Sequence, residues 1–220
     1  MMFNVFSRGA HMHLYRLWIA VWLIGLVPLV TGCDMGVEQV PNCAYISGNV
    51  LADPQFSALD ASSKERFWRY SQHAKNISFS YDATDGTLTF IKTGAEPWAL
   101  LSQTLDAEAL QGKRVEFSAN LKLDLSEPND AHVLGYGGGL ALLGRQVDEN
   151  GSKIRLSSNL KHEPRMGNHD WQRVTVVEDV PKRISHLYAG FLHRAGGTIQ
   201  VRDPALRVVT AGCELTVIGE

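Results

Sequence analysis

The stretch 113–123 places side chains that could bind a polar ligand at every second position. The residues between them are apolar, and a period of two is the pattern of a half-buried strand. Two interpretations follow: the polar face is a ligand floor if it lines the concave side of the fold beside Trp98 or Tyr136, and a solvated surface if it lies on the convex side. The polar residues of the stretch are Arg114, Glu116, Ser118, Asn120 and Lys122. The ligand-floor hypothesis assigns binding to Trp98, Arg114, Glu116, Asn120 and Tyr136.

Aromatic side chains are the second chemical feature, because their flat rings suit the C–H faces of pyranose sugars. The candidates are Trp68, Tyr70, Trp98, Tyr136 and Trp171. Each of these rings could equally fill the core of a β-protein, where aromatic side chains dominate the packing. We expect Trp98 and Tyr136 to belong to a ligand site. We expect Trp171 to be turned inward by a bulge at the start of its strand.

Other combinations that could catalyse a reaction are incomplete. His162, His169 and Asp170 match no zinc-binding spacing, and we expect them to be polar loop residues. The glycine-rich run 135–139 lacks the Lys and Ser/Thr of a phosphate-binding loop, so we expect its glycines to permit a bulge or a close backbone approach. No Gly-x-Ser-x-Gly motif is present, and no pair of carboxylates stands out for glycoside hydrolysis. We therefore expect a binding protein without a cofactor, and not an enzyme.

The N-terminal residues read as an export signal. Arg8 and Arg16 precede an uncharged apolar run at 17–30, which is shorter than the roughly 20 residues that span a bilayer as a helix. The run ends in Val-Thr-Gly-Cys, which resembles the lipobox of bacterial lipoproteins. The resemblance implies that residues 1–32 are a signal peptide and that the thiol of Cys33 is acylated. The alternatives are an ordinary signal peptide that happens to be followed by a cysteine, and a transmembrane helix.

Asp34 follows this cysteine. An aspartate at that position resembles the signal that retains lipoproteins in the inner membrane of Gram-negative bacteria. The resemblance implies a protein anchored by lipid on the periplasmic face of the inner membrane, with residues 33–42 as a tether. In a cell envelope without such sorting, Asp34 has no meaning.

Length, charge and cysteines narrow the class further. Removing residues 1–32 leaves 188 of 220 residues, enough for one domain with a sizeable core. The leader holds two of the 21 basic residues and none of the 23 acidic ones, so the remainder has a formal charge of −4, which argues against nucleic acid as a partner. In an oxidising compartment, Cys43 and Cys213 are expected to form a disulfide. Two free thiols or a metal site are the alternatives.

Short alternating runs separated by Gly, Asp, Asn and Pro predict an all-β fold of the sandwich or barrel type. Besides 113–123, strands are expected at 44–51, 77–81, 87–91, 98–104, 136–143, 171–177, 186–193 and 198–201. Asp85 and Gly86 predict a hairpin turn between two of these strands. Single helical turns are expected at 106–111, where Asp106 can cap, and at 62–68.

Several of these runs resemble the galactose-binding-like jelly rolls, the β-sandwich superfamily that includes many carbohydrate-binding modules. The matching motifs are a Ser-Gln strand followed by Leu-x-Gly-Lys-x-Val, an Asp-Trp-Gln strand ending in Val-Pro, a Gly-Phe-Leu strand, and a closing Gly-Thr-Ile-x-Val-x-Asp strand. They lie between residues 49 and 209. The resemblance implies a jelly-roll β-sandwich over residues 43–220.

The closing strand departs from many relatives, which carry consecutive aspartates and a structural calcium ion there. Here Asp203 stands alone between Arg202 and Pro204, so it is either an isolated calcium ligand or a turn residue, and the turn residue is our expectation. The resemblance implies a non-catalytic ligand-binding domain, with glycan as a candidate ligand. The alternative is a structural lipoprotein that docks another envelope protein.

Overall fold

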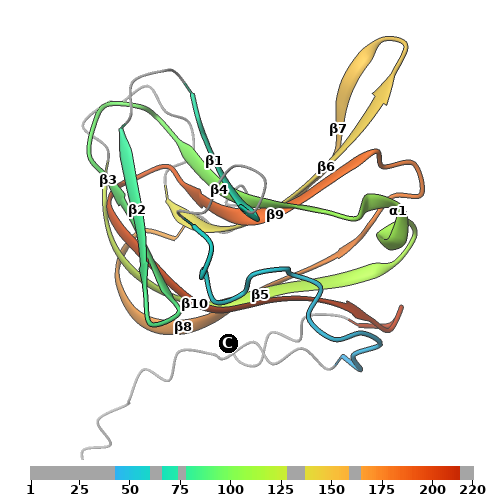
Figure 1. The fold of residues 1–220 in the computed structure, drawn as a ribbon, viewed down its shortest axis with the longest axis horizontal. Helices are drawn as coiled ribbons and strands as arrows, with labels where there is room; N and C mark the ends of the chain where they lie inside the picture. The colour runs from blue at the N-terminus through green and yellow to red at the C-terminus, as the bar shows by residue number, and fades with distance from the viewer. Residues whose placement is uncertain (1–42, 60–65, 74–77, 128–136, 159–164, 214–220) are drawn as a thin grey trace, which may run out of the picture. The chain divides into compact units, whose positions relative to one another are not determined.

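Two antiparallel sheets form the part of the chain that the computed structural model describes (Figure 1). The described residues are 43–59, 66–73, 78–127, 137–158 and 165–213. All of them belong to the second of two units into which the chain divides, Gly36–Glu220. Cys33, Asp34, Tyr136 and His162 lie outside the described residues.

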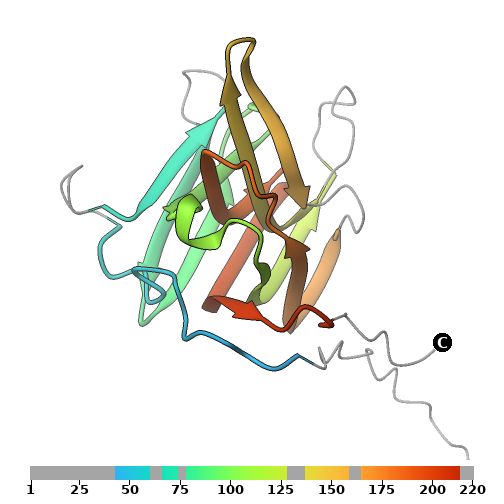
Figure 2. The same cartoon turned by 90° about the vertical axis from the view of Figure 1, so that its right-hand side faces the viewer.

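Each sheet has five strands. The first sheet runs in the order β1 (Trp68–Gln72), β4 (Ala99–Leu105), β9 (His186–His193), β6 (Gly138–Asp148) and β7 (Gly151–Ser158). The second sheet runs in the order β2 (Phe79–Thr84), β3 (Thr87–Lys92), β10 (Gly196–Val209), β5 (Arg114–Ser126) and β8 (Gly167–Asp179). The two sheets face each other, with the β6–β7 hairpin projecting beyond them (Figures 1 and 2). The predicted all-β jelly-roll sandwich is therefore confirmed.

The core lies between the sheets because alternate residues of each strand point inward. In β5 the predicted apolar face is buried, from Val115 to Leu125, with exposures of 5% or less. Aromatic rings fill the centre, where Trp68 stacks on Phe191 at a centroid separation of 5.4 Å and Phe56 lies 5.1 Å from Trp68. Burying side chains of this size stabilises a fold by about 1.5–3 kcal/mol each.

Turn chemistry fixes two of the connections. Asp85 and Gly86 have φ angles of 50° and 72°, and two positive φ angles are what a tight type I′ hairpin turn requires. The helical turn α1 (Ala107–Leu110) is capped by Asp106, whose carboxylate accepts a hydrogen bond of 3.0 Å from the backbone N–H of Ala109. Both predictions are confirmed. The helical turn predicted at 62–68 is wrong at its end, because Trp68 begins β1; residues 62–65 lie outside the described part.

The first described residues run beside the second half of β10. Backbone bonds of 2.8 Å join Ile46 to Val208 and Val50 to Leu206. The side chains of Ser47 and Asn49 accept the next bonds from β10, so only an isolated bridge at Tyr45 forms, and the strand predicted at 44–51 is wrong. The predicted disulfide between Cys43 and Cys213 is present, with their Cα atoms 4.7 Å apart.

Among the described residues, no helix has the length and apolarity needed to cross a bilayer.

Candidate functional site

The polar residues of β5 lie on the outer face of the second sheet, opposite the core. Most of them are bonded to the protein itself. Arg114 donates to Asp179 at 2.8 Å and to the carbonyl of Cys213 at 2.6 Å. Asn120 donates to the carboxylate of Asp203 at 2.9 Å. These residues are therefore engaged mainly in hydrogen bonds within the protein, and they do not form an open floor for a ligand.

Glu116 and Ser118 are the buried members of this face. Oε1 of Glu116 accepts hydrogen bonds of 3.1 Å from the hydroxyls of Tyr45 and Ser118. Arg173 donates to Ser118 at 2.7 Å, and the guanidinium of Arg207 lies 4.9 Å from the ring centroid of Tyr45. Burial, followed by the charge of Glu116, raises the pKa of Tyr45, so its phenol stays protonated and donates. Tyr45 thus covers the carboxylate from outside.

Trp98 immediately precedes β4, which is a strand of the first sheet, whereas β5 belongs to the second sheet. Of the two aromatic residues that were expected beside a ligand floor on β5, Trp98 or Tyr136, Trp98 therefore lies away from β5. Tyr136 lies outside the described residues. The five residues named for that floor are thus not gathered in one place by the described structure.

The prediction that Trp171 points into the core is wrong. Its ring lies outside the core, with the guanidinium of Arg202 4.1 Å from the ring centroid. The predicted bulge exists, because the pairing of β5 with β8 shifts between Leu121 and Leu123. Trp171 therefore shares the outer face with Arg173, as strict alternation along β8 places it, and the bulge does not turn it inward. His169 and Asp170, expected in a loop, are part of β8.

Asp203 is the candidate calcium ligand. It has a positive φ of 53° at the irregularity between Arg202 and Ala205, so it occupies a turn-like break inside β10. Its carboxylate accepts from Asn120 and lies 4.0 Å from the Nε of Arg202. No group of three potential metal ligands occurs among the described residues. The geometry fits the turn-residue interpretation of Asp203.

The outer face of the first sheet carries a different set of side chains. In β4, Ala99, Leu101 and Leu105 join the core, so the alternate residues Leu100, Ser102 and Thr104 point away from it. Continued back by two residues, the alternation places Trp98 on the same outer face. It is half-buried there and is not part of the core cluster.

A row of small residues crosses the middle of this face. Ser102 pairs with Gly190, and Gly190 pairs with Ala141 on its other side. A Cβ at Gly190 would lie 2.3 Å from the carbonyl oxygen of Leu101, so only glycine fits this position. The bulkier residues on either side are Leu100 and Leu192 in one row and Thr104, Tyr188 and Leu143 in the other. We call Ser102, Gly190 and Ala141 the small-residue row.

Tyr188 is the site candidate that the sequence interpretation missed. It lies opposite Thr104, and its half-exposed ring is nearly parallel to that of His186, at 9° and a centroid separation of 6.3 Å. The alternation of Leu187, Ala189 and Phe191 could have placed Tyr188 on the outside. Arg69 of β1 and Arg145 of β6 are exposed on the same face and were also missed.

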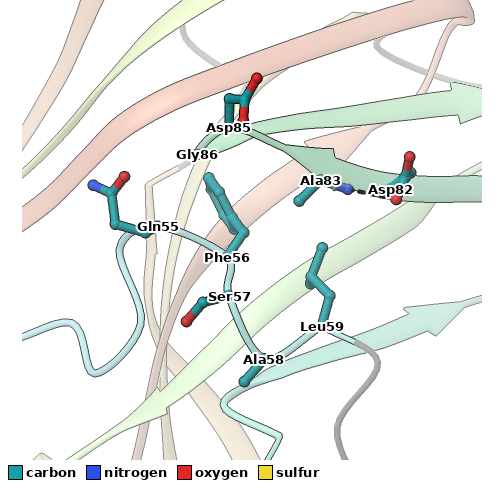
Figure 3. Close-up of a pocket in the computed structure, with 9 residues that line it drawn as sticks. All are labelled: Gln55, Phe56, Ser57, Ala58, Leu59, Asp82, Ala83, Asp85 and Gly86. Atoms are coloured by element: carbon teal, nitrogen blue, oxygen red, sulfur yellow. Dashed lines mark hydrogen bonds between the residues drawn. The ribbon is translucent and has the colours of Figure 1, made fainter.

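A cavity of about 530 Å³ opens at another place, between residues 55–59 and the β2–β3 hairpin (Figure 3). Phe56 and Leu59 point from the loop toward the hairpin, but they are only 2% and 5% exposed. Asp82 and Asp85 supply carboxylates from the hairpin. The cavity therefore offers acidic groups but no open aromatic face.

The glycines at 137 and 138 behave as predicted for a close backbone approach. A Cβ at Gly138 would lie 2.3 Å from Cδ1 of Ile199, and one at Gly137 would lie 2.7 Å from the carbonyl oxygen of Arg165. The neighbours are strands and loops of the protein itself. The described residues therefore show that these glycines permit close contact between segments of the protein itself.

No protein-family profile and no curated protein sequence matches this chain. Some solved structures are similar to it at a low level. The C-terminal family 22 carbohydrate-binding module of Clostridium thermocellum Xyn10B is 12% identical, with a TM-score of 0.44, over 80% of this chain and 96% of the module. The Stig cyclase Fisc from Fischerella is 10% identical, with a TM-score of 0.43, over 73% of this chain and 96% of the cyclase.

A third structure is the enzymatically active domain of tailspike protein 4 from bacteriophage CBA120. It is 14% identical with a TM-score of 0.47, and the match covers 73% of this chain and 21% of the tailspike. The chain thus spans about a fifth of that protein. A fold does not by itself specify a function, so the function of this chain has to be argued from its own residues.

Proposed function

We propose that this chain is a lipid-anchored protein of the bacterial cell envelope whose β-sandwich binds a glycan without converting it. The observation that carries the glycan proposal is the presence of two aromatic residues, Trp98 and Tyr188, on the outer face of the first sheet. Tyr188 is level with Thr104, six residues along β4 from Trp98, and a rise of about 3.3 Å per residue separates the two rings by roughly 20 Å. A chain of several sugars, and not one monosaccharide, fits that span.

The surface between the two rings suits a polyhydroxylated chain. The exposed hydroxyl of Thr104 can donate to and accept from sugar hydroxyls, and aromatic rings can pack against C–H faces. The small-residue row lets the ligand approach the sheet between two bulkier rows. Gly190 is required there because β4 and β9 approach too closely for a side chain.

The anchor is proposed from the sequence. The lipobox-like motif ends at Cys33, ten residues before Cys43, the start of the disulfide-closed domain. Acyl chains at Cys33 would hold the sandwich at the membrane surface, because each buried methylene contributes about 0.8 kcal/mol. Asp34 supports retention on the periplasmic face of the inner membrane.

One observation favours docking of an envelope protein as a second candidate function. Val147 and Ile154 are 56% and 61% exposed on the projecting β6–β7 hairpin (Figure 2). The register pairs Val147 with Ser152 and Arg145 with Ile154, so the two apolar side chains are diagonal neighbours on one face. A partner would bury this pair, whereas a glycan would bind near Trp98.

Glycan binding is tested by titrating oligosaccharides against the full chain, purified in a polyoxyethylene detergent that carries no sugar. We expect Trp98→Ala and Tyr188→Ala each to weaken binding about fivefold or more, because each removes an aromatic contact of about 1 kcal/mol. Trp171→Ala, on the outer face of the other sheet, is the matched control and should bind like the wild type. Equal loss in all three variants, or no binding by the wild type, would remove the proposed site.

Lipidation is tested with Cys33→Ser. We expect the variant to leave the membrane fraction or to remain unprocessed, because it cannot accept the diacylglyceryl group. Cell fractionation followed by mass spectrometry of the N-terminus measures both outcomes. A variant that is cut at the same site and stays membrane-bound would contradict the lipoprotein proposal.

A further inference from the structure

The outer face of the first sheet carries two exposed arginines. They are Arg69 on β1 and Arg145 on β6. None of the described residues that the alternation of β1, β4, β9 and β6 places on this face is Asp or Glu. Within the described chain, neither Arg69 nor Arg145 forms an ion pair.

The opposite outer face, on the second sheet, shows the contrast. There the cations pair with carboxylates, Arg114 with Asp179 at 2.8 Å and Lys122 with Asp170 at 3.5 Å. Arg202 lies 4.0 Å from Asp203. Because the whole chain has a formal charge of −2, an arginine-bearing face free of carboxylates is a local feature and not a consequence of composition.

Three side chains on the outer face of the first sheet are close enough to hold one charged sugar: Arg145, His186 and Tyr188. Arg145 and His186 are direct partners in the β6–β9 ladder, where paired Cα atoms lie about 4.5–5.5 Å apart. Tyr188 follows two residues later on the same face, and its ring is nearly parallel to that of His186. A ring stacked on Tyr188 would bring a substituent within reach of the guanidinium of Arg145.

We infer that this face selects saccharides that carry negative groups, either uronic-acid carboxylates or sulfate esters. A guanidinium binds either group through two parallel N–H donors, and such charge-assisted bonds are stronger than bonds between neutral groups. Arg69 lies level with the small-residue row, because it pairs with Ser102. It supplies a second cationic contact farther along the same ligand. The inference rests on the proposed glycan binding at this face.

The test compares matched acidic and neutral polymers on the full chain in the same detergent. Polygalacturonate is paired with its methyl ester, dextran sulfate is paired with dextran, and polyglutamate serves as a polyanion without sugar. We expect an acidic polymer to bind at least tenfold more tightly than its neutral partner and the difference to shrink as salt rises, since salt screens exposed charges. Polygalacturonate and dextran sulfate separate the carboxylate from the sulfate source.

Substitutions of single arginines test where the acidic polymer binds. We expect Arg145→Gln and Arg69→Gln to weaken binding of the preferred acidic polymer about tenfold, with binding of its neutral partner unchanged. Arg202→Gln, on the other sheet, is the matched control and should bind acidic polymer like the wild type. Equal binding of acidic and neutral polymers would overturn the inference and leave glycan binding intact. Polyglutamate bound as tightly as the acidic glycans would also overturn it, and no binding to any saccharide would overturn both proposals.

Discussion

His193 is a histidine in the interior of the sandwich. It is fully buried between the edges of Phe79 and Phe90, with ring centroids 5.2 and 5.4 Å away. Nε2 lies 3.1 Å from the carbonyl of Gly197, and Nδ1 accepts from the N–H of Ala195 at 3.4 Å. Both ring nitrogens are therefore used by the neutral form. Burial lowers the pKa of His193 to about 4, although the Gly197 carbonyl opposes the shift.

This histidine makes stability depend on pH in a defined direction. In the unfolded chain its pKa is about 6.5, so between pH 6.5 and 4 the unfolded state binds a proton that the folded state does not. The stabilisation is complete above pH 6.5 and is lost as pH falls, by about 2 kcal/mol at pH 5. We expect the free energy of unfolding in urea to fall less between pH 7.5 and pH 5 in His193→Gln than in the wild type. Parallel pH profiles would contradict a neutral buried His193.

Individual residues were predictable where local chemistry decides them. Asp106 as a helix cap, the Asp85-Gly86 turn and the pairing of Cys43 with Cys213 all follow from residue type and spacing. Trp171 was not predictable in the same way, because alternation leaves both directions open at a bulge. The cation that attracts its ring, Arg202, belongs to a strand about thirty residues later in the chain.

At the scale of elements, the close contact of β4 and β9 depends on one residue. A Cβ at Gly190 would lie 2.3 Å from the oxygen of Leu101 and 2.6 Å from the Cβ of Ser102. Because the clashing atom of Leu101 belongs to the backbone, no side-chain rotation can relieve the clash. The two central strands of the first sheet would have to separate.

We therefore expect Gly190→Ala to lower the free energy of unfolding by about 1–3 kcal/mol, the range typical of overpacking. Gly48→Ala is the matched control, because a Cβ at Gly48 meets nothing within 4 Å. Urea denaturation monitored by tryptophan fluorescence compares the two variants. Similar midpoints for both would show that the strands accommodate the methyl group.

The elements were predicted best where alternation is regular. The strands expected at 87–91, 98–104 and 186–193 appear with small changes of boundary as β3, β4 and β9. β7 was not expected, because it has only two large apolar residues, of which Leu156 is buried and Ile154 is exposed, and they give no clear periodicity. The segment 44–51 has a strand-like composition, but Ser47 and Asn49 use side chains for the bonds that a strand makes with its backbone.

For the whole molecule, the Cys43–Cys213 disulfide closes a loop with a sequence separation of 170 residues. The chain-entropy model gives about 5 kcal/mol for such a loop, an upper figure. We expect Cys43→Ser/Cys213→Ser to lose several kcal/mol of unfolding free energy. Amide exchange should speed up at Ile46 and Val50, which are bonded to β10, more than in β4. Reduction of the wild type should reproduce the result, and unchanged exchange at both residues would show that β10 holds the segment unaided.

The sandwich could be predicted as a whole, whereas the candidate site could not. The apolar face of β5 is visible in the sequence, but its polar face does not reveal which side of the sandwich it lies on. Trp98 and Tyr188 are 90 residues apart in the sequence, and the β4–β9 pairing brings them onto the same face of one sheet. A single sequence carries the period of each strand but not the order of strands in a sheet.

The position of β10 has a consequence for how the protein is made. β10 is the last of the described strands along the chain, yet it stands between β3 and β5 in the middle of its sheet. Without residues 196–209, the β2–β3 hairpin and the β5–β8 pair share no strand, and their inner edges remain open. This sheet therefore closes only after residues 196–209 have been made, and a chain cut before residue 196 would leave it as two pieces.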